Sequence, residues 1–366
     1  MQIRPFQAIC PNWEKLPVPP DNFFESVKEN FVALQNSEYF SNSLQPEAIY
    51  IYRIQTLFGI HTGVVACADV QDYVAGNILG HEHTLDEKIS QQRGLFLERN
   101  AIVKPVLLTY PPEPAIQAFL ENYIGKTTAF CNLKMQHEKH QLWQVKDPKN
   151  LQILQLLFQK HLPHAVIADG HHRVSTAATL FEQHSQKKYA SFLTAFFASD
   201  QLEILPFYRI VKLSKEASHY LFFEELSKIC DIRHTEYAVP LHRPRQMTMY
   251  FAKKWYELSW KNDFLEKISS KGTLDVSLLN EHIIIPLLGV ADIRSSSRIK
   301  YVEGSRKWSE IASQINQDGG AQSVAFGLYP LDIRDMMQAA TTRQTLPPKS
   351  TCFAPRMKNG ILIQKF

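Results

Sequence analysis

Short strand-like and helix-like segments alternate along this chain, and their order constrains the fold more than any other feature. Residues 48–55 and 62–69 are rich in β-branched and aromatic residues, and the short segment between them contains a glycine, which predicts a β-hairpin. Residues 165–168 form an apolar strand-like run that leads into a helix-like segment at 172–182. Hairpins combined with intervening helices predict an α+β (mixed α/β) fold rather than one doubly wound sheet.

The length and charge of the chain limit its organisation and its partners. With 366 residues it exceeds what one hydrophobic core usually serves, so we predict two domains, residues 1–200 and 201–366. The net charge of +4 comes from scattered Lys and Arg residues, without the basic stripe typical of nucleic-acid binding. The five cysteines form no CxxC pair, and no signal peptide or membrane-spanning run is recognisable. We therefore expect a cytoplasmic protein without nucleic-acid or membrane partners.

The segment from Asp169 to Arg173 is the first candidate site. A strand ends at Asp169, Gly170 turns the chain, and a helix begins with His171, His172 and Arg173. Unpaired amides and the dipole at a helix N-terminus favour an anion, and a glycine lets a phosphate approach the backbone closely. Arg173 could hold phosphate oxygens through its planar guanidinium, while Asp169 could cap the helix, orient a histidine or hold a metal ion.

A second cluster, His81-Glu82-His83-Thr84, follows another short strand-like segment. Its two histidines, together with those of the first segment and the aspartate there, could bind a transition metal in a hydrolase. Neither cluster, however, has the i, i+4 spacing of the familiar zinc hydrolase motif. A Mg²⁺ ion bound mainly through nucleotide phosphates needs fewer protein ligands and fits the sequence better.

The run from Ile167 to Arg173, followed by Ala177, is similar to the nucleotide-binding signature of the ParB/sulfiredoxin-like superfamily. The chain as a whole resembles the domain-of-unknown-function family 1015. That resemblance runs through residues 3–6, 80–84, 205–209, 274–276, 329–330 and 347–351. It implies a ParB/sulfiredoxin-like nucleotide-binding N-terminal part followed by a second α+β domain whose role is not specified.

The same resemblance implies the activity of the free-serine kinases in the superfamily. Such a kinase transfers a phosphoryl group from ATP or ADP, with Mg²⁺, to the hydroxyl group of L-serine and produces O-phosphoserine. In those kinases a His-Glu motif supplies a carboxylate near the substrate hydroxyl, so Glu82 is the predicted general base. Asp169 and His172 complete the predicted catalytic residues. The residues predicted to bind the nucleotide phosphates are Gly170, His171, His172 and Arg173.

Further candidates are less specific. The residues that could contact the substrate are His81, His83, Thr84, Lys349 and Ser350. Lys349 and Ser350 follow two prolines in a rigid turn that presents a cation and a hydroxyl group. Lys104, in a strand predicted over residues 102–110, belongs to no motif and receives no role. Two other function classes stay open: a nucleotide-binding regulatory or DNA-associated ParB-like module, and a metal-dependent hydrolase that uses His and Asp. A homo-oligomer is also compatible with the sequence.

Overall fold

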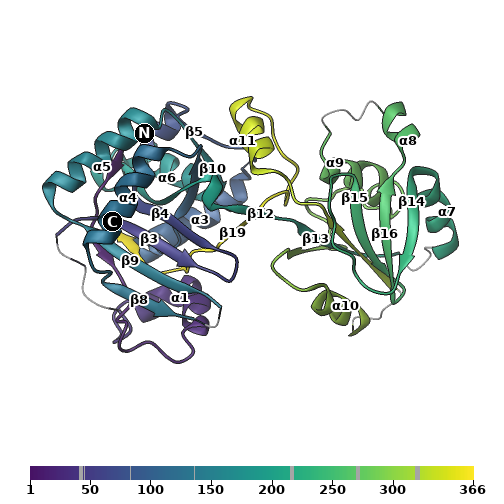
Figure 1. Cartoon of the computed structure of the whole chain (residues 1–366), viewed down its shortest axis with the longest axis horizontal. Helices are drawn as coiled ribbons and strands as arrows, with labels where there is room; N and C mark the ends of the chain where they lie inside the picture. Colours follow the sequence, from purple (N-terminus) through teal and green to yellow (C-terminus); the bar gives the residue numbers. More distant parts are fainter. Residues whose placement is uncertain are drawn as a thin grey trace. The chain divides into compact units, whose positions relative to one another are not determined.

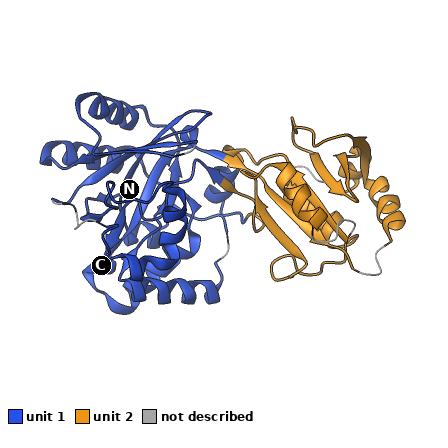
Figure 2. Cartoon of the chain, turned by 90° about the horizontal axis from the view of Figure 1, so that it is seen from below, with its two compact units in different colours: residues 1–203, 336–345, 353–366 blue, residues 204–335, 346–352 orange. Residues whose placement is uncertain are grey.

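The computed structural model describes residues 1–40, 44, 46–82, 84–135, 137–214, 218–268, 273–317 and 322–366. Two compact units make up the chain, and each has a main sheet of its own (Figure 2). Unit 1 contains residues 1–203, 336–345 and 353–366, and unit 2 contains residues 204–335 and 346–352. The chain thus first leaves unit 1 close to the expected boundary, but C-terminal segments that we assigned to the second domain belong to unit 1.

Unit 1 is built on a nine-stranded mixed sheet with the order β5-β10-β7-β11-β4-β3-β9-β8, to which β1 adds beside β4. Figure 1 labels β3, β4, β5, β8, β9 and β10 of this sheet. The strands are β1 (Ile3–Arg4), β3 (Ile49–Gln55), β4 (Ile60–Asp69), β5 (Ile78–Leu79), β7 (Val106–Tyr110), β8 (Cys131–Lys134), β9 (Lys139–Val145), β10 (Ala165–Asp169) and β11 (Ser191–Ala198). The predicted hairpin is confirmed, since β3 and β4 pair antiparallel with Gln55 opposite Ile60. Because β4 and β11 are buried along nearly their whole length, both faces of the sheet centre are covered.

Some of the helices of unit 1 begin at a residue whose side chain caps them. They are α1 (Asp21–Leu34), α2 (Val70–Val74), α3 (Asp86–Arg99), α4 (Pro114–Lys126), α5 (Pro148–His161) and α6 (His171–His184). The Asp147 side chain accepts a hydrogen bond from the Asn150 amide at 2.9 Å, and Pro148 occupies the first turn of α5, where a missing N–H costs nothing. Helices α2 and α3 both contact α6, and α4 contacts α5.

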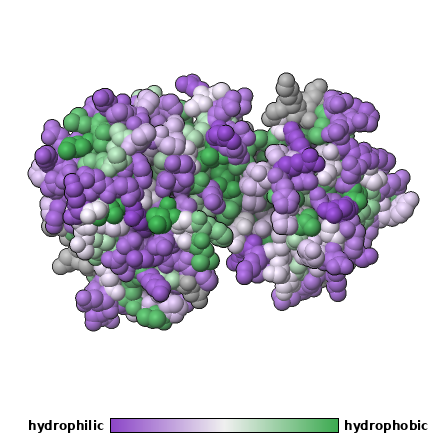
Figure 3. Space-filling view, viewed as in Figure 1, coloured by the Kyte–Doolittle hydropathy of each residue, from purple (hydrophilic) through white to green (hydrophobic). Residues whose placement is uncertain are grey.

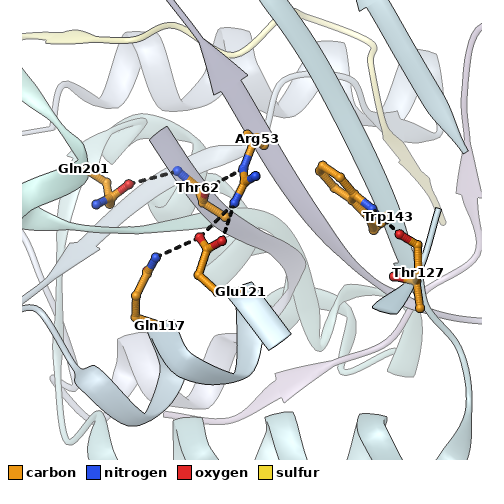
Figure 4. Close-up of polar contacts among 7 residues, drawn as sticks. All are labelled: Arg53, Thr62, Gln117, Glu121, Thr127, Trp143 and Gln201. Atoms are coloured by element: carbon orange, nitrogen blue, oxygen red, sulfur yellow. Dashed lines mark hydrogen bonds and ion pairs between the residues drawn. The ribbon is translucent and has the colours of Figure 1, made fainter. Parts of the chain in front are cut away.

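A polar cluster ties α4 to the sheet (Figure 4). Arg53 of β3 forms a bidentate ion pair with Glu121 of α4, with distances of 2.8 and 2.7 Å from Nη2 to the two carboxylate oxygens. The Nε atom of Arg53 donates to Thr62 Oγ1 at 3.0 Å, and its guanidinium lies 5.7 Å from the Trp143 ring centroid. The planar guanidinium is therefore fixed by a carboxylate, a hydroxyl group and an aromatic face together.

A small three-stranded sheet brings distant parts of unit 1 together. It has the order β2-β20-β6 and consists of β2 (Ala8–Ile9), β20 (Ile363–Lys365) and β6 (Ala101–Ile102). The prediction of a single strand over residues 102–110 is therefore wrong, because β6 ends at Ile102 and β7 begins at Val106. Pro105 lies in the break, where it cannot donate to a ladder hydrogen bond.

Unit 2 contains a six-stranded antiparallel sheet with the order β14-β16-β15-β18-β13-β17. Its strands are β13 (Phe207–Lys212), β14 (Cys230–Thr235), β15 (Gln246–Phe251), β16 (Lys254–Trp260), β17 (Ile299–Glu303) and β18 (Ser323–Leu328). Its helices are α7 (His219–Ile229), α8 (Asn262–Lys267), α9 (Asp275–Leu279), a π-helical turn at Asn280–Ile284, and α10 (Trp308–Gln317). Three elements lie where the chain passes from one unit to the other: helix α11 (Ile333–Thr341) and the short strands β12 (Glu203–Leu205) and β19 (Cys352–Ala354). The two strands pair with each other. One unit has a mixed sheet and the other an antiparallel sheet, and both units contain helices. The predicted α+β class is therefore confirmed.

The polarity of the surface and the burial of the cysteines are those of an ordinary globular protein. Hydrophilic residues cover most of the face drawn in Figure 3. No helix in the described ranges is long and apolar enough to cross a membrane. All five cysteines are buried, and none of them forms a disulfide bond.

Candidate functional site

Three segments of unit 1 meet at one edge of its sheet. Strands β5 and β10 are parallel neighbours, so the residues that follow them, 80–85 and 170–173, leave the sheet at the same edge. Strand β7 runs antiparallel to β10 on its other side, which brings the residues just before β7 to that edge as well. The topology therefore joins both predicted clusters, and it adds Lys104 and Pro105 to them.

Gly170 makes the turn between β10 and α6. Its φ of +107° lies in a region that favours glycine, and a Cβ atom there would lie 2.7 Å from a guanidinium nitrogen of Arg173. Gly170 is itself the N-cap of α6, with no side-chain cap, so the helix start keeps amides available. Asp169, which we considered as a helix cap, instead ends β10 and uses its carboxylate elsewhere.

The Asp169 carboxylate bridges two cations. Its Oδ2 atom lies 2.7 Å from Lys104 Nζ and 2.9 Å from Arg173 Nη2. The other guanidinium nitrogen of Arg173, Nη1, donates to the carbonyl oxygens of Lys104 and Pro105, at 3.0 and 2.5 Å. These carbonyls are free to accept because the chain between β6 and β7 is not paired in a sheet. Arg173 is thereby held in one orientation, with its side chain 10% exposed.

The charges of Lys104, Asp169 and Arg173 do not sum to zero. Burial alone would raise the pKa of Asp169, but the charges of Arg173 and Lys104 outweigh it and hold that pKa well below its usual range. Burial, reinforced by the neighbouring Arg173, lowers the pKa of Lys104, and Asp169 opposes that shift. With one carboxylate between two cations, this group keeps an excess positive charge beside the N-terminus of α6, which favours an anionic ligand.

His171 is buried and holds the 80–85 loop. Its Nε2 atom accepts a hydrogen bond from the His81 backbone N–H at 3.2 Å, and the two imidazole rings lie edge to face, 4.6 Å apart. Burial, with the nearby His81 as a further cause, lowers the pKa of His171 to about 3, so its ring is neutral near pH 7. Because Nε2 accepts, the single proton of the neutral ring is on Nδ1, which lies 3.9 Å from Glu82 Oε2.

His172 makes the equivalent contact one residue further on. Its Nε2 atom accepts from the backbone N–H of Leu85, the N-cap of α3, at 3.2 Å. Thr84, at the position before Leu85, is half-buried and does not cap α3. His83 lies outside the described residues. Two consecutive histidines of α6 thus fix the loop that carries Glu82, whose side chain is 29% exposed. The roles assigned to them in phosphate binding and catalysis stay predictions.

His81 is the most buried member of the site. Its side chain is 1% exposed, and burial lowers its pKa to about 4. Neither of its ring nitrogens has a hydrogen-bond partner among the residues that the structure describes. A neutral imidazole always carries one N–H, so this ring has a donor available inside the site.

The remaining candidates lie elsewhere or form no cluster. Lys349 and Ser350 belong to unit 2, where Ser350 donates to the carbonyl oxygen of Pro347 at 2.6 Å. Within the described ranges, no three His, Cys, Asp or Glu side chains are arranged to hold a metal ion. Lys104 is the site residue that sequence reasoning missed, because only the β7–β10 pairing brings it near Asp169.

Comparison with known proteins gives distant structural likenesses. SbnI from Staphylococcus aureus, with a C-terminal truncation, is 13% identical, with 81% of this chain and 85% of that chain covered and a TM-score of 0.42. A free serine kinase in complex with ADP is 12% identical, with 82% and 92% covered and a TM-score of 0.39. A conserved hypothetical protein from Pyrococcus furiosus is 12% identical, with 82% and 95% covered and a TM-score of 0.39. A separate comparison with curated proteins gave no significant match.

The family model gives the stronger result. The model described as protein of unknown function (DUF1015) matches residues 11–277, which is well over half of the chain. The match includes the 80–85 loop, the segment before β7 and the turn into α6, and thus all of the candidate site in unit 1. The chain therefore belongs to the DUF1015 family.

Proposed function

We propose that unit 1 is a nucleotide-dependent kinase that phosphorylates a small hydroxylated metabolite, with free L-serine as acceptor and ATP or ADP as donor. The observation that carries the proposal is the excess positive charge formed by Lys104, Asp169 and Arg173 at a helix N-terminus, with Glu82 on the adjoining loop. Phosphoryl transfer depends mainly on positioning and charge neutralisation, which this arrangement supplies. The resemblance of residues 80–84 and 167–173 to the kinase motifs supports it.

Each group has a role in this proposal. The backbone at Gly170 and the first amides of α6 bind phosphate oxygens, with Arg173 and Lys104 as the cations and Mg²⁺ held through the phosphates. Asp169 keeps the two cations in place. Glu82 accepts the proton of the serine hydroxyl as its oxygen attacks the terminal phosphorus. The bond from that phosphorus to the bridging oxygen breaks, and ADP leaves from ATP, or AMP from ADP.

The histidines act on the loop and on the acceptor. His171 and His172, which accept hydrogen bonds from the loop amides, position Glu82 in this proposal. The unpartnered ring of His81 supplies a donor for the acceptor molecule. A hydrogen bond from this ring to an oxygen atom of the acceptor molecule would contribute to selectivity, since the buried donor is otherwise left without a partner.

Nucleotide binding tests the proposal before turnover is measured. Isothermal titration with ATP and with ADP, in the presence of Mg²⁺, should show binding to the wild-type protein. Lys104→Ala removes one charge-assisted contact and should weaken that affinity roughly tenfold or more. Lys126→Ala, at the exposed end of α4, makes the same change of charge away from the site and should leave the affinity unchanged. Absence of binding at millimolar nucleotide would overturn the kinase assignment.

A further inference from the structure

Arg209 of β13 is a fully buried cation in unit 2. Its side chain is 1% exposed, although a guanidinium stays charged in proteins. Nη1 donates to the carbonyl oxygen of Phe207 at 3.1 Å, and Nη2 donates to the carbonyl oxygen of Lys349 at 3.1 Å. The Nε atom is buried and has no hydrogen-bond partner among the described residues. Arg209 therefore has unused hydrogen-bonding capacity in a place closed to bulk water.

No carboxylate compensates this charge in the described part of the chain. The guanidinium lies 5.5 Å from the ring centroid of Tyr301, its neighbour on β17. Burial lowers the pKa of Arg209 to about 10, and Tyr301 is the one group that opposes this shift. The Tyr301 hydroxyl donates to the carbonyl oxygen of Ile293, so it supplies no negative charge. An aromatic face offsets only part of the cost of removing a cation from water.

A second cation lies on the same face of β13. Lys349 Nζ is 5.2 Å from the ring centroid of Phe207, which is two residues from Arg209 and so points to the same side of the strand. The Lys349 side chain is exposed, while its backbone carbonyl accepts the bond from Arg209. Two cations from separate segments thus lie on this face of β13. Each lies against an aromatic ring, and Arg209 also donates to carbonyl oxygens. Of the two cations, only Lys349 is exposed to solvent.

We propose that Arg209 and Lys349 form a binding site in unit 2 for a small anion that carries a carboxylate or phosphate group. The unpartnered Nε–H of Arg209 can donate to an oxygen atom of such a group, and Lys349 adds a point charge on the exposed side. Both residues of this site belong to unit 2, whereas the proposed kinase residues belong to unit 1. The opposing interpretation is a structural one, in which Arg209 serves only to tie residues 346–352 to β13.

Arg209→Met separates the two interpretations in the full-length protein. Removing a buried cation that lacks a counter-ion, at similar volume, should raise the Tm of the anion-free protein by about 3 °C. A purely structural tie predicts a lower Tm instead. Arg298→Met is the matched control, because Arg298 also donates to backbone carbonyls in unit 2, those of Lys212, Gly289 and Leu288, at 3.0, 2.9 and 2.6 Å. This control should lower the Tm.

Anion titration tests the ligand directly. Calorimetric scans in Tris chloride, with inorganic phosphate or acetate added against sodium chloride of equal ionic strength, should show a concentration-dependent rise of the wild-type Tm. The rise should be clearly smaller in Arg209→Met, where only the phosphate-binding groups of unit 1 remain, and it should also diminish in Lys349→Ala, which alters an exposed side chain. The more effective of the two anions identifies the group that the site prefers. If neither anion raises the wild-type Tm above the chloride control, or if Arg209→Met responds as the wild type does, the proposal is wrong.

Discussion

His171→Phe tests how the 80–85 loop is held. Phenylalanine keeps a ring against His81, where the two rings lie 4.6 Å apart, but it removes the acceptor that the His81 amide uses at 3.2 Å. A buried N–H without a partner costs about 1–3 kcal/mol. Since 1.4 kcal/mol corresponds to a factor of about ten in an equilibrium constant, the amide should exchange its hydrogen roughly 5- to 150-fold faster.

Hydrogen exchange followed by mass spectrometry measures this in the peptide that contains the His81 amide. His171→Gln, whose side-chain oxygen can approach the position of Nε2, should restore most of the protection. His184→Phe, in the last turn of the same helix, is the control and should leave that peptide unchanged, since His184 packs on Tyr189 instead. Equal exchange in wild type and His171→Phe would refute the interpretation of His171 as the residue that positions the loop.

Three further predictions concern stability. In Gly63→Ala, the new Cβ would lie 2.5 Å from a backbone oxygen of β11, so urea unfolding should show a loss of about 1–3 kcal/mol, and an unchanged midpoint would contradict this packing. A double-mutant cycle on Arg53 and Glu121 should give a coupling energy of about 0.5–1 kcal/mol, modest because Glu121 is 49% exposed, whereas simple additivity would show that the pair contributes nothing. Burial keeps the pKa values of His81 and His171 near 4 and 3, below the unfolded value, so the unfolded state binds more protons below about pH 6.5. The free energy of unfolding should therefore decrease as the pH is lowered, and at pH 5.5 each histidine should have lowered it by about 1.4 kcal/mol relative to neutral pH. A flat profile from pH 7 to 5 would argue against two buried neutral rings.

Local patterns in the sequence predicted much of the fold. The hairpin of β3 and β4, the strand β10 and the helix that follows Gly170 were all legible, because apolar periodicity and a glycine turn act over a few residues. The strand expected over residues 102–110 failed at Pro105, whose missing N–H divides it. That break also frees the carbonyls that orient Arg173, so a local error concealed part of the site.

Contacts between distant segments could not be predicted in the same way. Lys104 reaches Asp169 only because β7 pairs with β10, and nothing in the spacing of the sequence specifies that pairing. The neutral state of His171 likewise follows from burial by other segments and not from its own motif. The return of residues 353–366 to unit 1 depends on the pairing of β20 with β2 and β6, which joins both ends of the chain.

Product formation tests the central proposal most directly. The purified protein is incubated with Mg²⁺, L-serine and either ATP or ADP, and O-phosphoserine is followed by mass spectrometry. We expect the wild-type protein to form product. Glu82→Gln should form none, although it should still bind the nucleotide with the same affinity. The control variant Glu87→Gln, in the exposed first turn of α3, should stay active. Absence of phosphoserine with both nucleotides would contradict serine as acceptor, and undiminished turnover in Glu82→Gln would contradict the assignment of the general base.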